Sequence, residues 1–269
     1  MTDLAIVIVS FNAAVDLAAC LASLAAARPS VPHEIIVVDN ASSDASVLTA
    51  RGVPGVQVIP LDTNLGFAAA NNVGIRATSG ELILLLNSDT IVPPGAIDAL
   101  VARLRLDPVI AVAGPRLVDG RGQPELSFGR MIGFGVESRR KLLMRRIAAG
   151  AGDSLDWLRN ETSREHIVDW VSGACLLVRR RDAETVGLLD ERFFLYTEDV
   201  DFCASIRKLG RKVLFTPVAT ITHLRGRSRA ARPDAAQKAY RRSHVAFYEK
   251  HHPIWAPVLK LYLRAKGEL

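Results

Sequence analysis

Several hallmarks of common protein classes are absent from this chain of 269 residues. Its three cysteines, Cys20, Cys175 and Cys203, lie far apart and form neither a zinc-binding pattern nor an even set for disulfides. No apolar run approaches the roughly 20 residues that a membrane-spanning helix needs. The first residues lack the basic segment of a signal peptide and lead directly into a predicted strand. We therefore expect a protein of the reducing cytoplasm.

Glycine-rich phosphate motifs are missing as well. The early predicted strands carry no G-x-G-x-x-G, and the chain has no G-x-x-x-x-G-K-[ST], which argues against dinucleotide-binding and P-loop proteins. Aromatic residues make up only 6% and no nucleic-acid motif is present, so we expect no nucleic acid as partner. The net charge of +6 still favours anionic partners such as nucleotides or anionic lipids.

The basic residues are concentrated in the second half of the chain. A functional basic face and an ordinary solvated surface both stay open as interpretations. The clusters are Arg139–Lys141, Arg145–Arg146, Arg179–Arg181, Arg225–Arg232 and Arg241–Arg242.

The first half of the chain alternates apolar strands with helices. Strands are predicted over Leu4–Val9, Glu34–Val38, Val56–Ile59, Leu82–Leu86 and Ile110–Ala113. Helices are predicted over Asp16–Ala27, after Ser42–Asp44, and over Gly66–Thr78 and Ala96–Leu106. Continuous apolar strands that alternate with helices indicate an α/β fold, with a mostly parallel, Rossmann-like sheet covered on both faces.

The second half departs from this alternation. A Gly- and Arg-rich insertion with one basic helix is followed by strand, helix, strand and a basic C-terminal helix. The ranges are Gly120–His166 with its helix at Val136–Ala149, then Asp169–Val178, Asp199–Leu209, Lys212–Phe215 and Pro233–His252. We predict a catalytic domain over 1–228, divided at 115/116 into a nucleotide-binding half and an acceptor-side half, and a helical extension over 229–269.

Carboxylates follow two predicted strands at the points where the strands end. Asp89 closes the run Leu86-Asn-Ser-Asp, and Asp39 follows Val38. The carboxyl edge of a parallel sheet is where ligands bind in such folds. Asp89 could hold a divalent cation against a diphosphate, and Asp39 could accept the N–H of a pyrimidine base. Both are also favoured turn and cap residues, and that alternative stays open.

Smaller polar groups lie near the other strand ends. Ser10 and Asn12 follow the first strand, and Asn64, Gly66 and Asn71 follow the third. Gly66 fits a tight turn into a helix whose N-terminus suits a nucleotide phosphate or ribose. A helix cap with exposed amides is the alternative.

Three acids, Glu198, Asp199 and Asp201, gather at the predicted start of a helix. Crowded carboxylates raise one another's pKa, which suits a general base. Ordinary pairing of acids with the helix dipole is the alternative. His223 offers an imidazole to a metal ion or a phosphate, or has a structural role.

Taken in order, these segments resemble the second glycosyltransferase family, whose members are inverting enzymes of the GT-A fold. Bacterial cell-envelope rhamnosyltransferases are the most similar in style, and the resemblance covers about residues 4–225. It is carried by Val9–Asn12, Val38–Asp44, Asn64–Phe67, Leu86–Asp89, Gly173–Val178 and Thr197–Asp199.

The resemblance implies a nucleotide-diphosphate sugar as donor, a polyprenyl-diphosphate-linked or glycan acceptor, and Mg²⁺ or Mn²⁺ as cofactor. Asp39 would contact the base, Asp89 and His223 the metal, and Asp199 would be the catalytic base, with Glu198 and Asp201 beside it. The nucleotide-sugar site would also include Ser10, Asn12, Asn64, Gly66, Asn71, Asn87, Ser88 and Asp89. Asn87 stands where the family's D-x-D motif has its first Asp, and it brings no charge.

The predicted function is sugar transfer in cell-envelope synthesis, with L-rhamnose from dTDP-rhamnose as the leading donor. A UDP-sugar transferase of the same fold, for galactofuranose or N-acetylglucosamine, is the first alternative. A non-catalytic nucleotide-binding module would need Asp39 but not the acids at 198–201. A nucleotidyltransferase usually has a Gly-rich, basic loop after the first strand, where this chain has Ser10–Asn12.

The C-terminal tail combines apolar, aromatic and basic side chains. Trp255 and Tyr262 suit a membrane–water interface, and Lys260 and Arg264 suit anionic headgroups. We expect the protein to be peripheral on the inner face of the plasma membrane. Alternatively, the tail packs on the catalytic domain or on the second subunit of a homodimer.

Overall fold

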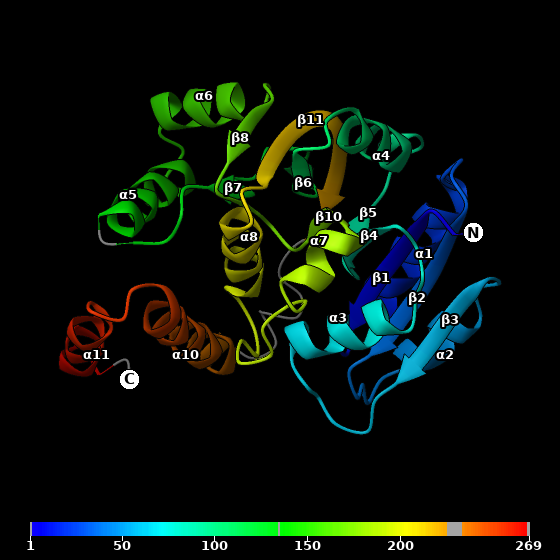
Figure 1. The fold of residues 1–269 in the computed structure, drawn as a ribbon, viewed down its shortest axis with the longest axis horizontal. Helices are drawn as coiled ribbons and strands as arrows, with labels where there is room; N and C mark the ends of the chain where they lie inside the picture. The colour runs from blue at the N-terminus through cyan, green and yellow to red at the C-terminus, as the bar shows by residue number, and fades with distance from the viewer. Residues whose placement is uncertain (1, 134, 225–232, 268–269) are drawn as a thin grey trace.

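A computed structural model describes residues 2–133, 135–224 and 233–267 (Figure 1), so the basic cluster at 225–232 lies outside the described residues. One sheet of nine strands runs through the molecule in the order β3-β2-β1-β4-β10-β6-β11-β5, with β8 paired to β11. A small second sheet pairs β7 with β9. The strands are β1 (Leu4–Ser10), β2 (His33–Asp39), β3 (Val56–Pro60), β4 (Leu82–Asn87), β5 (Thr90–Ile91), β6 (Ile110–Val118), β7 (Phe128–Gly129), β8 (His166–Val168), β9 (Trp170–Val171), β10 (Cys175–Arg179) and β11 (Lys212–His223).

The strands β1 to β4 are parallel, as predicted from their continuous apolar sequences. β10 is antiparallel to both of its neighbours, β4 and β6, whereas β6 and β11 are parallel to each other. The carboxyl ends of β1, β2 and β4 therefore share one edge of the sheet with the beginning of β10. The predicted α/β class is confirmed.

Helices cover both faces of the sheet. Alternate side chains of one strand enter different cores: Ile83 and Leu85 of β4 pack with α3 and α8, whereas Leu84 and Leu86 pack with α1 and α4. Two buried faces explain why these strands are apolar at every position. The helices are α1 (Ala14–Ala26), α2 (Ser46–Arg51), α3 (Phe67–Arg76), α4 (Ala96–Leu106), α5 (Val136–Ala148), α6 (Gly152–Glu161), α7 (Arg180–Thr185), α8 (Glu198–Lys208), α10 (Pro233–His251) and α11 (Ala256–Ala265).

The second half differs from the predicted elements in several places. The strand expected over 169–178 is interrupted between β9 and β10, where Gly173 faces α8. The strand expected over 212–215 continues to His223 through an irregularity between Thr216 and Thr220. Helix α6 was not predicted, because it lies in the Gly- and Arg-rich insertion, whose mixed periodicity indicated one helix only. Helix α7 and the short strands β7 and β8 were not predicted either. These differences matter for function, because the first two bring Gly173 and His223 to the shared edge of the sheet.

The C-terminal extension is part of the main core. Phe247 and Tyr248 of α10 and Leu259 and Leu263 of α11 are buried in the same cluster as Phe202 of α8. Within the described residues, no helix is both long and apolar enough to cross a membrane. The tail therefore packs at least one apolar side on the catalytic domain, as the alternative interpretation of the sequence expected.

Candidate active site

Two buried polar side chains end the neighbouring strands β1 and β2. Ser10 and Asp39 are direct partners in the strand register and are 0% and 1% exposed. Asp39 Oδ1 accepts a 2.9 Å hydrogen bond from the amide of Ser42. Asp39 Oδ2 and Ser10 Oγ are buried without a hydrogen-bond partner among the described residues. Because unpartnered buried oxygens are costly, this pair is suited to a ligand that donates to the carboxylate.

Asn12 links the loops that follow β1 and β2. Its side-chain oxygen accepts a hydrogen bond from the backbone amide of Ser43 at 2.8 Å, and its backbone amide donates to Ser42 Oγ at 2.9 Å. Asn12 has a left-handed backbone with φ of 50°, which Asn tolerates better than most residues. Asn12 thus shapes the loop beside Asp39.

A network of amides forms the turn before α3. Asn64 Oδ1 accepts from the amide of Gly66 at 2.9 Å and from the side chain of Asn40 at 3.0 Å. Asn40 also accepts from the amide of Leu65 at 2.8 Å. Nothing in the sequence singled out Asn40, whose role depends on this contact across 24 positions. The network holds the turn in one conformation.

Gly66 allows this turn to touch the segment that precedes α8. It has φ of +86°, and a Cβ built there would lie 2.4 Å from the carbonyl oxygen of Phe194. The first amide of α3, on Phe67, donates to that same oxygen at 2.7 Å. Asn71 donates to the Phe67 carbonyl at 2.9 Å within α3. The N-terminus of α3, expected to face a phosphate, therefore binds the protein's own backbone through Phe67.

His223 lies between two carboxylates at the end of β4. Its Nε2 is 3.3 Å from Asp89 Oδ1, and its Nδ1 is 3.3 Å from Glu125 Oε2. Burial opposes the charge on the ring, but hydrogen bonds to Asp89 and Glu125 outweigh it and raise the pKa of His223 to about 9. The pairing of Thr90 with His223 brings the far end of β11 to this point. Glu125 was missed from the sequence, because it lies in the irregular insertion.

Asn87 and Ser88 complete the end of β4. The Asn87 side-chain nitrogen lies 3.5 Å from His223 Nε2, and its side-chain oxygen is buried without a partner among the described residues. Ser88 is half-buried. Asn87 therefore offers an acceptor beside Asp89 without adding charge.

Asp199 and Glu198 begin α8 on the other side of the β4 end. Asp199 Oδ2 accepts a 2.9 Å hydrogen bond from the backbone amide of Gly173, and its Oδ1 accepts a 2.8 Å hydrogen bond from the backbone amide of Val200. Burial raises the pKa of Asp199 despite these lowering contacts. Burial and the charge of Asp199 raise the pKa of Glu198 well above its usual range, and Glu198 Oε2 has no partner among the described residues. This pair can take up and hold a proton.

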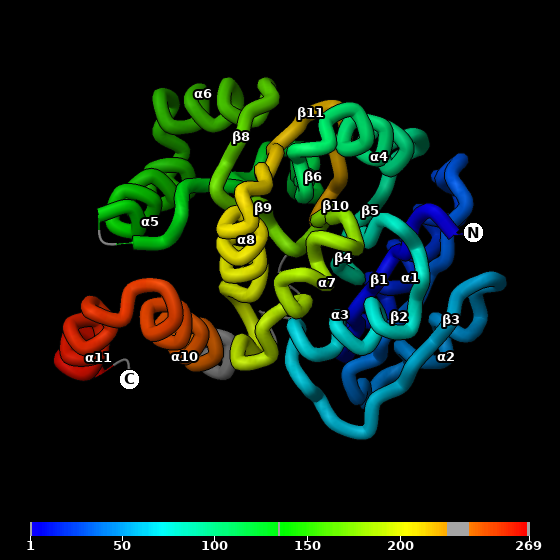
Figure 2. The backbone as a smooth tube through the Cα atoms, viewed as in Figure 1, coloured from blue at the N-terminus to red at the C-terminus, as the bar shows by residue number. Residues whose placement is uncertain are grey.

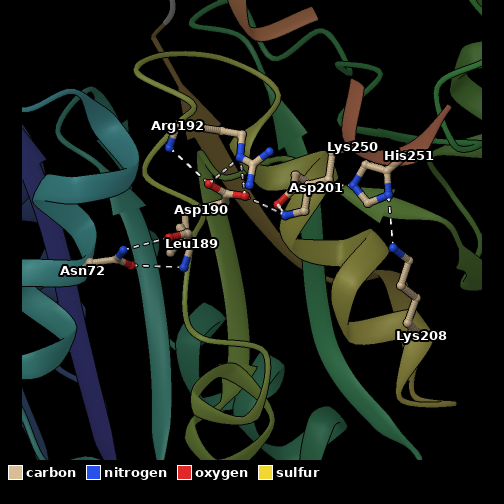
Figure 3. A network of polar contacts seen from close by, with 8 residues as sticks. All are labelled: Asn72, Leu189, Asp190, Arg192, Asp201, Lys208, Lys250 and His251. Atoms are coloured by element: carbon tan, nitrogen blue, oxygen red, sulfur yellow. Dashed lines mark hydrogen bonds and ion pairs between the residues drawn. The ribbon is translucent and has the colours of Figure 1, made fainter. Parts of the chain in front are cut away.

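Asp201 faces a different part of the molecule, although only two residues separate it from Asp199. Asp201 is buried, and its carboxylate lies 2.8 Å from Lys250 Nζ and 2.6 Å from His251 Nε2 (Figure 3). Both partners belong to α10. The sequence grouped the three acids, whereas the structure gives Asp201 the contacts of an ion pair that joins α8 to α10.

The segment between α7 and α8 passes between α3 and α10 (Figure 2). On the α3 side, Asn72 donates to the carbonyl of Leu189 at 2.8 Å and accepts from its amide at 3.1 Å. On the α10 side, Lys250 binds Asp190 at 2.8 Å, and Ser243 donates to the carbonyl of Leu195 at 2.8 Å. These contacts hold the chain that leads into Glu198 and Asp199.

Comparison with protein families and curated proteins gives consistent matches. The family model described as glycosyl transferase family 2 matches residues 5–159. An N-acetylglucosaminyl-diphospho-decaprenol L-rhamnosyltransferase of Mycobacterium tuberculosis (strain ATCC 25618 / H37Rv) is 30% identical, and the alignment covers 95% of this chain and 87% of that protein. The O-antigen biosynthesis protein RfbC of Myxococcus xanthus is also 30% identical, over 95% of this chain but 20% of that protein.

Solved structures share the fold. A mannosyltransferase from Pyrobaculum calidifontis, in complex with GDP-Man and Mn²⁺, has a TM-score of 0.63 at 16% identity, covering 97% of this chain and 70% of that one. GalNAc-T7 with UDP, GalNAc and Mn²⁺ has a TM-score of 0.62 at 18% identity, covering 83% and 43%. At these identities the likeness concerns the fold, which is that of the GT-A glycosyltransferases.

Proposed function

The chain belongs to glycosyl transferase family 2 and is a glycosyltransferase, and we propose that it transfers L-rhamnose from dTDP-rhamnose to a polyprenyl-diphosphate-linked sugar. This acceptor class is supported by the name of the M. tuberculosis relative, which is aligned over most of both chains. A UDP-sugar donor remains the alternative, because thymine and uracil offer the same imide N–H.

One arrangement carries the proposal: three kinds of group lie along one edge of the sheet. Asp39 with its unpartnered oxygen ends β2, Asp89 and His223 meet just after β4, and Asp199 lies beside the beginning of β10. In the reacting molecules, the nucleotide base, the diphosphate and the hydroxyl of the acceptor follow one another in the same order as these residues. Asp39 accepts the imide N–H, and Ser10 Oγ lies beside it for the nucleoside.

The remaining polar residues shape and complete the donor site. Asn12 fixes the loop beside Asp39. Asn64 and Gly66 form the turn before α3, and Asn71 belongs to the first turns of that helix. Asn87 and Ser88 lie on the donor side between the base and the diphosphate. There the buried side-chain oxygen of Asn87 accepts a hydrogen bond from a hydroxyl of the donor.

The residues present fit a divalent cation. No group of three or more His, Cys, Asp and Glu is arranged to hold a metal among the residues described, so a site formed by protein alone is not available there. Mg²⁺, however, commonly takes one or two carboxylates and completes its shell with phosphate oxygens and water. Asp89, with its side chain 21% exposed, supplies one such carboxylate. His223 would supply an imidazole nitrogen once the cation displaces the proton that its raised pKa favours. Mg²⁺ or Mn²⁺, when bound, would offset the charge of the leaving diphosphate.

Asp199 is the proposed general base of a single displacement. It removes the proton from an acceptor hydroxyl, the hydroxyl oxygen bonds to the anomeric carbon, and the bond from that carbon to the diphosphate breaks. Attack from the face opposite the diphosphate inverts the configuration. A carboxyl with a raised pKa suits this step, because the proton-accepting strength of a base increases with its pKa.

A lipid-linked acceptor would bring the reaction to a membrane surface. We place it at the cytoplasmic leaflet, where nucleotide sugars are available to an enzyme of the reducing cytoplasm. A homodimer is compatible with this placement and is not required for it.

A donor screen tests the proposal. The purified protein is incubated with dTDP-rhamnose, UDP-galactofuranose or UDP-N-acetylglucosamine and a short polyprenyl-diphosphate-linked N-acetylglucosamine, and release of nucleoside diphosphate is measured. We expect acceptor-dependent release from dTDP-rhamnose and a higher donor KM for Asp39→Ala. If the protein prefers a UDP-sugar, the proposed donor is wrong. If no donor gives acceptor-dependent release, the proposed acceptor class is wrong.

A further inference from the structure

Helix α11 is apolar on two faces, and the residues that the structure describes bury only one of them. Ala256, Leu259 and Leu263, spaced i, i+3 and i+7, are buried in the main core. Val258, Leu261 and Tyr262, spaced i, i+3 and i+4, are 48%, 70% and 53% exposed. The sequence left open whether the tail packs on the domain or on a membrane, and the two faces are compatible with both.

The exposed apolar surface continues into the turn before α11. Ile254 is 86% exposed and Trp255 is 51% exposed. Together with Val258, Leu261 and Tyr262 they form what we call the outer face of α11. Contiguous large apolar side chains on a protein surface usually mark a binding site. An aromatic pair of Trp and Tyr is typical of surfaces that meet the membrane–water interface.

Cations border the outer face. Arg264 and Lys266 are exposed, and Lys266 Nζ lies 4.7 Å from the ring centre of Tyr262. The helix itself, Ala256–Ala265, contains no acid. Lys260 is paired with Glu249 of α10, an exposed acid near this face. Among the described residues of this face, the balance of charge is therefore basic.

Helix α5 lies at the same end of the molecule as α11 (Figure 1) and is also basic. Arg139, Lys141 and Arg145 are exposed on it, around Leu142, which is 60% exposed. Its Glu137 is turned inward, 2.6 Å from the buried His244. This end thus combines two helices that expose apolar and cationic groups together.

We propose that the outer face of α11 docks on an anionic lipid surface, with the exposed cations of α5 and α11 at the headgroups. A helix lying in the interface needs an apolar side with cations along it, which matches this face. A second copy of the chain would be repelled by the same cations, and the cores of protein interfaces are depleted of charge. Docking on lipid is independent of the proposed reaction.

Vesicle sedimentation tests the proposal on the full chain. We expect binding to vesicles of phosphatidylcholine with phosphatidylglycerol, and at least about tenfold weaker binding to phosphatidylcholine alone or in high salt, which screens surface charges. The double variant Leu261→Ser/Tyr262→Ser should lose at least about tenfold in affinity, because both side chains partition into the interface. Leu106→Ser is the matched control: Leu106 is 79% exposed on α4, away from this face, and should bind like the wild type.

Three results would overturn the proposal. These are no sedimentation of the wild type with the anionic vesicles, equal binding of the double variant, and a lipid-free dimer that the double variant dissociates. A dimer of this kind would assign the outer face to a second copy of the chain, and the molar mass of the protein in solution detects it. Unchanged melting temperature and donor binding by the variant establish that it is folded, so these outcomes are separate from those of the donor screen.

Discussion

Lys250 of α10 binds Asp201 of α8 at 2.8 Å, in a pair whose carboxylate side chain is 2% exposed and whose ammonium side chain is 24% exposed. The same Lys250 binds Asp190 at 2.8 Å, so one C-terminal residue ties down both the start of α8 and the segment that precedes it (Figure 3). Asp199 is two residues from Asp201 on this helix. The C-terminal extension therefore supports the candidate base.

Replacing Lys250 should destabilise the protein. Lys250→Met leaves Asp201 with His251 alone, and we expect a loss of roughly 2 kcal/mol in unfolding free energy, below the 3–5 kcal/mol typical of a broken buried pair because one partner remains. Lys260→Met, which removes an exposed pair with Glu249, is the control and should change stability by less than about 1 kcal/mol. Urea unfolding measures both. Equal stability of the two variants would contradict this role for Lys250.

Asp199 and Glu198 should respond differently to amide substitution. Asp199→Asn should lower kcat by about 10²–10⁴-fold, because the amide cannot take the acceptor proton. Glu198→Gln should keep most activity, because burial and the charge of Asp199 raise the pKa of Glu198 well above its usual range and favour the protonated form, which Gln resembles. Steady-state kinetics with a fixed acceptor measures both, and donor binding should be similar in the two variants. Full activity of the Asp199→Asn variant would show that Asp199 is not the general base.

The raised pKa values predict opposite effects of pH on activity and stability. Activity should fall as pH drops through the raised pKa of Asp199, because the base must be deprotonated. Stability should change the other way: a carboxyl whose pKa is raised by folding favours the native state below its unfolded pKa, and that contribution is lost as pH rises through the folded pKa. Glu198→Gln should therefore raise the melting temperature at pH 7–8 and have little effect near pH 4. Thermal scans at both pH values measure this, and an unchanged melting temperature at pH 8 would argue against a raised pKa.

Transfer should depend on a divalent cation. Chelation should abolish activity, and Mg²⁺ or Mn²⁺ should restore it. Asp89→Asn and His223→Ala should raise the metal concentration needed for half-maximal activity, because each removes one of the two proposed ligands. Titration calorimetry of Mn²⁺ with nucleoside diphosphate present measures the same loss without turnover, with Asp98→Asn on α4 as a control. Full activity after exhaustive chelation would exclude the metal.

Much of the donor half could be predicted from the sequence. Apolar strands such as Leu82–Leu86 alternate with helices, so the parallel sheet follows from local patterns, and Asp39 and Asp89 lie at its carboxyl edge because they follow strands directly. The order of the motifs predicted the family, which the comparisons confirm. The roles of individual side chains stay predictions.

The sequence by itself determined the parallel strands of the first half, the edge of the sheet on which their polar ends lie, and the family. Only the tertiary structure decided which acids share a site. Asp199 and Asp201 are two positions apart, and in a helix such positions point in different directions, so one meets Gly173 and the other meets α10. Glu125 and His223 are 98 positions apart and meet because β11 extends past its predicted end. Contacts of that kind depend on packing between distant segments, which no local pattern encodes.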